Sequence, residues 1–143
     1  NASSIQLSRG YIKTSTSYYY SSGLSTSSSS RTSIPATSDI IIFQITGDDG
    51  RYYARVDAGE TGQHLTFIYE TIGSNNKVNI AFINGSNVAK LGVGTGLVSE
   101  LVFDTSGQSS QLIYIGFGTP YDSANAIARS RWQVVNTGAS IVE

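Results

Sequence analysis

Short runs of alternating apolar and polar residues constrain this chain most, because a side-chain period of two residues is typical of half-buried β-strands. The runs are rich in Val, Ile, Tyr and Phe and are bounded by Gly, Asn or Ser. They are Arg51–Val56, Leu65–Glu70, Lys77–Ile83, Val98–Phe103, Gln111–Ile115 and Arg131–Val135. No window of the sequence has a convincing helical period, so the pattern predicts an all-β protein with little or no helix.

Turn residues between these runs predict hairpins. Ile40–Ile45 and Arg51–Val56 are separated by Gly47–Gly50, where Asp and Gly readily adopt φ > 0. Gly73–Asn76 joins Leu65–Glu70 to Lys77–Ile83 in the same way. We therefore expect two antiparallel hairpins at these places.

The length of 143 residues indicates a single domain spanning residues 1–143. With about eight antiparallel strands and this density of turns, a β-sandwich or jelly roll fits better than a closed barrel. One segment, residues 21–33, is dominated by Ser and Thr and predicts a long loop with loose order. Ile40–Ile45 differs from the other runs because it is apolar on both faces at its start.

Composition argues against several functions. Charged residues make up 13% of the chain and the formal net charge is −1, so no basic field is available for a nucleic acid or an anionic membrane. Cysteine is absent and His64 is the only histidine, which argues against a zinc site and predicts no metal and no cofactor. A surface built from Ser, Thr and Asn suggests an extracellular or virion location.

Enzymatic motifs are also missing. His64 lies at the head of a predicted strand and has no G-x-S-x-G partner motif. Gly92–Gly96 is followed by an alternating strand and not by a helix, so it predicts a tight inter-strand loop and not a phosphate site. The carboxylates are scattered mainly at turns and strand ends. We therefore expect a protein that is not an enzyme.

Aromatic residues suggest ligand binding instead. Nine Tyr and one Trp could offer flat faces to a sugar, with polar side chains beside them. Tyr18, Tyr19 and Tyr20 precede the Ser-rich segment, and Tyr121 and Asp122 follow a Gly-Thr-Pro turn. Asp48 and Asp49 are first of all turn residues, because the calcium-loop spacing is missing. These residues are the candidate ligand contacts, whereas Trp132 is expected in the core.

Three segments, in order, resemble the tip domains of bacteriophage and large-DNA-virus fibres. The first is Thr61-Gly62-Gln63 leading into Leu65–Tyr69 and then Val78-Asn79-Ile80. The second is Leu112-Ile113-Tyr114, and the third is Arg131–Val135 followed by Asn136–Ser140. Ser17-Tyr18 and Ile34-Pro35-Ala36-Thr37 also resemble the opening of those domains. The sequence departs from the pattern by inserting residues 116–130 between the second and third segments.

This resemblance implies a jelly roll of the tumour-necrosis-factor type, assembled as a homotrimer and joined through its N-terminus to a fibre shaft. It implies a head domain on the virion surface that attaches to a host receptor, with carbohydrate the favoured receptor class. A partner subunit would also explain the loss of alternation in Ile40–Ile45, because both faces of that strand would then be buried.

Two other interpretations remain open. A secreted β-sandwich lectin or carbohydrate-binding module would be a monomer or dimer with a compact sugar site. A purely structural virion protein would form an oligomer without any ligand. Mass in solution and glycan binding distinguish the three.

Overall fold

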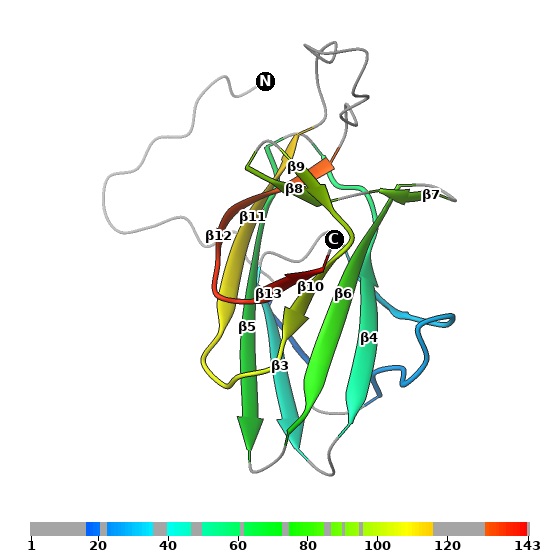
Figure 1. The fold of residues 1–143 in the computed structure, drawn as a ribbon, viewed down its shortest axis with the longest axis vertical. Coiled ribbons are helices and arrows are strands. Elements are labelled where there is room, and N and C mark those ends of the chain that lie inside the picture. Colours follow the sequence, from blue (N-terminus) through cyan, green and yellow to red (C-terminus); the bar gives the residue numbers. More distant parts are fainter. Residues whose placement is uncertain are drawn as a thin grey trace, which may run out of the picture.

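A computed structural model describes residues 17–20, 23–35, 40–46, 50–60, 62–72, 75–84, 87–89, 91–94, 96–115 and 131–142. All regular elements in these ranges are β-strands, arranged as two facing sheets (Figure 1). One sheet has seven strands, in the order β1 (Ser17–Tyr20), β3 (Ile40–Thr46), β5 (His64–Ile72), β11 (Ser109–Ile115), β12 (Arg131–Thr137), β8 (Leu91–Val93) and β9 (Gly96–Val98). The other has six, in the order β13 (Ser140–Val142), β10 (Glu100–Phe103), β6 (Lys77–Asn84), β4 (Arg51–Val56) and β2 (Thr32–Ile34), with β7 (Asn87–Ala89) paired to β6. The all-β class and the sandwich-like layering are thus confirmed.

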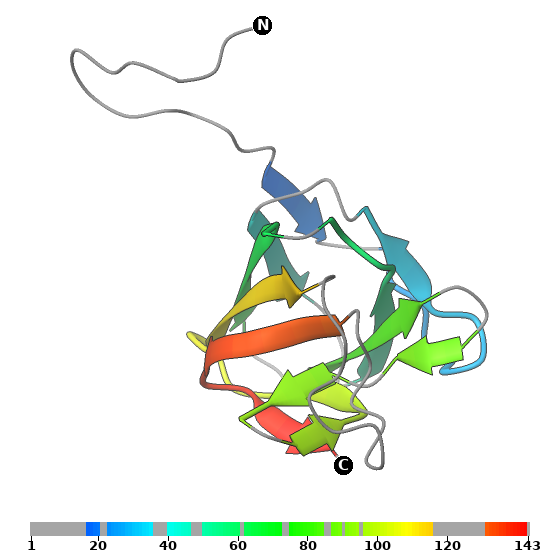
Figure 2. The same cartoon turned by 90° about the horizontal axis from the view of Figure 1, so that it is seen from above.

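The sheets are mixed and not purely antiparallel as predicted. From β1 to β6 the chain alternates between the two sheets, so that β1, β3 and β5 are neighbours in one sheet and β2, β4 and β6 are neighbours in the other (Figure 2). Each of these neighbouring pairs is parallel. A return to the same sheet in parallel requires a crossover, and here the crossover is a strand of the opposite sheet.

Both predicted hairpins are therefore wrong. β3 and β4 lie in different sheets, as do β5 and β6, so each turn joins the layers and does not pair its two strands. The alternating pattern shows which side chains of a strand are buried. The same side chains are buried whether the next strand forms backbone hydrogen bonds with that strand or lies opposite it in the other sheet. Residues that adopt φ > 0 are suitable both for a hairpin turn within one sheet and for a connection between two sheets.

The later strands follow the expected antiparallel arrangement more closely. β11 pairs antiparallel with β5 on one side and with β12 on the other, with a register shift between Gln111 and Leu112. β10 pairs antiparallel with β6 and with β13. β8 and β9 form a two-stranded antiparallel unit through Gly94, whose φ of 58° lies in the left-handed region.

Aromatic side chains from both sheets meet in the core. Phe103 of β10 lies with its ring centroid 6.2 Å from that of Phe67 and 6.1 Å from that of Tyr69, both on β5. Phe43 of β3 stacks on Phe67 at 6.0 Å. The Tyr69 hydroxyl donates a 2.6 Å hydrogen bond to the Asn76 carbonyl, and burial raises the pKa of Tyr69 above its ordinary value. Buried hydroxyls need such a partner, and the pair links the aromatic cluster to the β5–β6 connection.

The outer face of the seven-stranded sheet carries half-buried apolar residues. In β3, Ile41, Phe43 and Ile45 point into the core, whereas Ile40 and Ile42 are only half-buried. Ile42 is in register with Ile68 of β5, which is also half-buried. The strand alternates in burial, although its sequence does not alternate in polarity.

The predicted Ser-rich loop contains more structure than expected. β2 occupies Thr32–Ile34 and overlaps the last two residues of the predicted segment 21–33, and Leu24 is a buried core residue. The loop proper therefore lies between Leu24 and Thr32 in the described part of the segment.

In the part of the chain that the structure describes, no helix has the length and apolar character needed to span a membrane.

Candidate binding hollow on the six-stranded sheet

The predicted ligand contacts lie mostly outside the residues that the structure describes. Tyr18, Tyr19 and Tyr20 form β1, at the edge of the seven-stranded sheet, and their side chains lie outside the description. Asp48, Asp49, Tyr121 and Asp122 lie outside the described residues altogether. Their predicted role in ligand binding stays a prediction.

His64, Gly92–Gly96 and Trp132 lie where the sequence predicted them. His64 begins β5 and is exposed, as expected of a strand-end residue. Gly92–Gly96 contributes to β8, β9 and the turn between them, which confirms an inter-strand loop. Trp132 is 2% exposed and its indole Nε1 donates a 3.0 Å hydrogen bond to the Asp57 carbonyl, which confirms its place in the core. Among the described residues, no group of three or more His, Asp or Glu side chains is placed to hold a metal.

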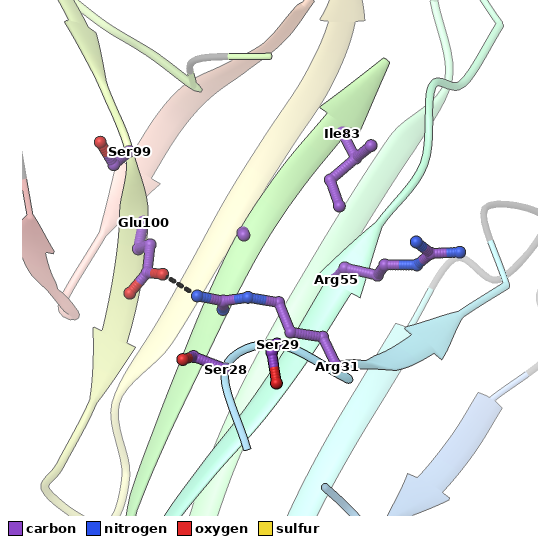
Figure 3. Close-up of a pocket in the computed structure, with 8 residues that line it drawn as sticks. Ser28, Ser29, Arg31, Arg55, Ile83, Ser99 and Glu100 are labelled. Atoms are coloured by element: carbon purple, nitrogen blue, oxygen red, sulfur yellow. Dashed lines mark hydrogen bonds and ion pairs between the residues drawn. The ribbon is translucent and has the colours of Figure 1, made fainter. Parts of the chain in front are cut away.

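A hollow of about 350 Å³ lies on the outer face of the six-stranded sheet (Figure 3). Its lining comes from the loop before β2 and from β4, β6 and the start of β10, and consists of Ser28, Ser29, Arg31, Arg55, Ala81, Ile83, Ser99 and Glu100. The two apolar members, Ala81 and Ile83, belong to β6, the middle strand of the three. The hollow therefore has an apolar floor and a polar rim.

Strand register explains why the hollow exists. Arg55 of β4, Ala81 of β6 and Glu100 of β10 are directly opposite one another across three neighbouring strands. Two inter-strand spacings separate the backbones of Arg55 and Glu100 by about 10 Å. The small side chain of Ala81 leaves the space between the two long charged side chains open.

Arg31 closes one side of the hollow. Its guanidinium Nη2 forms an ion pair with Glu100 Oε1, and Nη1 donates to the Ala54 carbonyl at 3.4 Å. The other Glu100 oxygen, Oε2, accepts a 2.7 Å hydrogen bond from Asn79 Nδ2. The guanidinium carbon also lies 5.2 Å from the ring centroid of Tyr53. With side chains only 14% and 16% exposed, Arg31 and Glu100 form a largely desolvated pair that joins the loop to the sheet.

Hydroxyl groups shape the loop that carries Arg31. Ser25 N–H donates to Thr32 Oγ1 at 2.8 Å, and the Tyr53 N–H donates to the Ser25 carbonyl at 2.8 Å. Ser27 N–H donates to Ser25 Oγ at 3.1 Å, in a local side-chain turn. Serine is thus present because its hydroxyl replaces backbone partners that a strand would supply. Ser28 and its neighbour Ser29 are left at the rim of the hollow (Figure 3).

Among the described residues at or near the hollow, two polar atoms have no hydrogen-bond partner: one belongs to Arg55, which lines the hollow, and the other to Asn79, which is buried beneath the same face of the sheet. Arg55 Nε has no hydrogen-bond partner, and the nearest acid is the Asp57 Oδ1 at 3.9 Å. Asn79 Oδ1 is buried without a partner, and Asn79 itself is 4% exposed. In chemical terms the hollow offers donors and hydroxyls for a polar ligand. Its lining includes one carboxylate, Glu100, whose two oxygens are both engaged, whereas glycoside hydrolysis uses two carboxyl groups.

Sequence reasoning missed the residues of this hollow. Glu100 was one of many scattered carboxylates, and Arg31 ends the Ser-rich segment without any motif. The sequence shows only that Arg31 is the one charged residue between Lys13 and Asp39. Nothing in the sequence shows that its ion-pair partner is 69 positions away.

Comparison of the chain with family models, with curated proteins and with solved structures finds no significant match in any of the three.

Proposed function

We propose that this domain is a non-enzymatic attachment module, the head of a viral or phage fibre, which binds a host-surface carbohydrate in the hollow beside Arg31 and Glu100. The hollow carries this proposal because its two kinds of lining match the two kinds of surface on a sugar ring. Ala81 and Ile83 suit the C–H face, and the serine hydroxyls and arginines at the rim suit the hydroxyl groups. A volume of about 350 Å³ is at the lower end of small-molecule sites and suits one or two sugar units.

The arrangement of the three resemblance segments supports the fibre-head part of the proposal. Their longest strands fall on β5, β11 and β12, which are consecutive neighbours in the seven-stranded sheet, whereas Val78-Asn79-Ile80 lies on β6 of the other sheet. Most of the resemblance is thus gathered in one sheet, although its parts are far apart in sequence. The finer topology, a jelly roll of the tumour-necrosis-factor type, remains part of this proposal.

A homotrimer on the virion surface, joined through its N-terminus to a shaft, belongs to the same proposal. The half-buried Ile42 and Ile68 lie side by side on the outer face of the seven-stranded sheet, with Ile40 on the same face. A partner subunit packed there would complete the burial of an apolar surface that a monomer leaves partly wet. The hollow lies on the other sheet and would stay accessible to a receptor.

Attachment of the purified domain to host cells, with free saccharides as competitors, tests this function. The double variant Ser28→Ala with Ser29→Ala should weaken attachment, because it removes two rim hydroxyls. Thr26→Ala with Ser30→Ala is the matched control in the same loop, and it should attach like the unmodified protein. Attachment that no saccharide reduces, or equal loss in both double variants, would contradict carbohydrate binding in the hollow.

A secreted lectin is the second candidate, because the hollow is complete within one chain and needs no partner subunit. The mass in solution, measured by light scattering, distinguishes a secreted lectin from a fibre head. A mass near three times 15.2 kDa supports the fibre head, whereas a monomer that binds saccharide supports the lectin. A trimer without any ligand would instead support a structural virion protein.

A further inference from the structure

We infer that the ligand of the hollow carries a carboxylate group, and that Arg55 is the residue that recognises it. This inference rests on the proposed function and adds the chemical class of the saccharide: an acidic sugar in place of a neutral one.

Among the charged side chains that line the hollow, one cation has no partner in the lining. Three charged side chains line it, Arg31, Arg55 and Glu100. Arg31 and Glu100 neutralise each other at close contact, and Asn79 occupies the remaining Glu100 oxygen. The hollow as a whole therefore has an excess positive charge that resides on Arg55.

Arg55 is only weakly engaged by the protein. Its one acidic neighbour in the described structure is Asp57, at 3.9 Å from Nε, which is beyond hydrogen-bonding distance. The side chains of Arg55 and Asp57 are 43% and 52% exposed, and ion pairs this open to water contribute little. The Nε–H of Arg55 has no hydrogen-bond partner in its present position, so a ligand acceptor met after the guanidinium reorients would satisfy a donor that the protein leaves unpaired.

The position of Arg55 is suitable for this role. Its stem lines the hollow, and Figure 3 shows its guanidinium extending along the rim, away from the Arg31–Glu100 pair. Rotation about the outer side-chain torsions of a half-exposed arginine can bring the guanidinium over Ala81. A planar guanidinium binds a carboxylate through two parallel hydrogen bonds, which an ammonium or an amide cannot reproduce.

The remaining lining would hold the neutral part of the ligand. A sugar ring placed over Ala81, with its carboxylate toward Arg55, has the hydroxyls of Ser28, Ser29 and Ser99 around its other edges. Each Glu100 oxygen accepts one protein hydrogen bond and keeps a second lone pair that a sugar hydroxyl can use. Because Arg31 compensates its charge, Glu100 does not strongly repel the ligand carboxylate. Each kind of ligand group thus meets a complementary group of the protein.

Binding of galacturonic acid, its methyl ester and galactose, measured by NMR titration of the full chain, tests the inference. The three probes share a pyranose ring and differ in the C6 group, so that only the acid carries a charge. The acid should bind roughly tenfold more tightly than the ester or galactose, which corresponds to about 1.4 kcal/mol. Arg55→Gln should abolish the preference and leave all three probes equal.

Arg51→Gln provides the matched control. Arg51 lies on the same strand and the same face as Arg55, four residues earlier, and it is exposed and outside the hollow. The variant changes the net charge by the same amount and should keep the preference for the acid. Loss of the preference in both variants would show a general charge effect and overturn the role of Arg55.

Failure of the inference and failure of the proposed function give different results. Equal binding of all three probes at the hollow, with signals of Ser28 and Ala81 shifting, would overturn the acidic class and leave carbohydrate binding intact. Absence of any shift at the hollow would overturn the inference as well, and attachment to cells that saccharides do not reduce would overturn the proposed function itself.

Discussion

The two faces of the six-stranded sheet use the same strands for different purposes. On the inner face, Val56, Ile80 and Phe103 are fully buried and belong to the hydrophobic core. On the outer face, Arg55 and Glu100 line a hollow and form ion pairs. Residues adjacent in sequence therefore belong to different parts of the protein, since successive side chains of a strand point to opposite faces. The comparison indicates that stability depends on the inner face, whereas the proposed binding hollow lies on the outer one.

The largest expected effect comes from the inner face. Phe103→Ala should lower the free energy of unfolding by about 3–5 kcal/mol, because it leaves a cavity among Phe43, Phe67 and Tyr69. Urea denaturation followed by the fluorescence of Trp132 measures this change. Phe103→Leu, which keeps most of the volume, is the control and should lower stability by much less. A loss below 1 kcal/mol in Phe103→Ala, as expected on average for any substitution, would contradict the division between the faces.

The second effect tests the one strong interaction of the outer face. Glu100→Gln should destabilise the protein by about 2 kcal/mol, less than a fully buried pair would, because Arg31 loses its counter-ion in a site that water partly reaches. The same denaturation experiment measures it. Glu70→Gln, at an exposed position of β5, is the matched control and should change stability by about 0.5 kcal/mol or less. Equal effects in the two variants would show that the Arg31–Glu100 pair does not hold the loop.

A smaller effect is expected at Tyr69, where a polar group lies inside the core. Tyr69→Phe should destabilise the protein by about 1 kcal/mol at neutral pH, because the Asn76 carbonyl loses the hydroxyl that it accepts from. Thermal unfolding at fixed pH measures this change.

The raised pKa of Tyr69 leads to a further prediction, on how stability changes with pH. Burial raises its pKa above the ordinary value of 10.0, so its contribution is complete below pH 10. Above that pH the unfolded chain releases the Tyr69 proton while the folded protein retains it, and stability falls as the pH rises toward the folded-state pKa. Melting temperatures between pH 8 and pH 11 should fall less steeply in Tyr69→Phe than in the unmodified protein. Parallel curves would contradict a raised pKa.

The smallest effect on stability is expected at Arg55. Arg55→Gln and Arg51→Gln should each change the free energy of unfolding by about 0.5 kcal/mol or less, because both side chains are solvated and weakly paired. Denaturation curves of the two variants should overlap with that of the unmodified protein. A marked destabilisation by Arg55→Gln alone would place Arg55 in the structural framework and not at a free binding rim.

The sequence predicted where strands occur better than it predicted which strands pair with one another. The alternating segments Leu65–Glu70, Lys77–Ile83 and Gln111–Ile115 all form strands. Burial alternates along the first and the third, whereas every residue from Val78 to Phe82 is buried. Thirteen strands occur in the described residues where about eight were expected, because short strands such as β2, β8 and β13 are too brief to show a period. The predicted hairpins failed since a turn between two strands does not reveal whether they pair side by side or face each other.

The candidate site could not be predicted in the same way. Its residues come from four segments that have no shared motif, and Arg55, Ala81 and Glu100 become neighbours only through the register of β4, β6 and β10. Register is a property of strand pairing, which depends on contacts between residues distant in sequence.

The sequence by itself determined the all-β class, most of the core and the absence of cysteine chemistry, because alternation and composition act locally or through simple counts. Tertiary structure alone decided that the first six strands alternate between two sheets, that parallel pairs result, and that Arg31 reaches Glu100. The physical reason is that burial can be inferred from one strand, whereas pairing and cavities require the relative position of several.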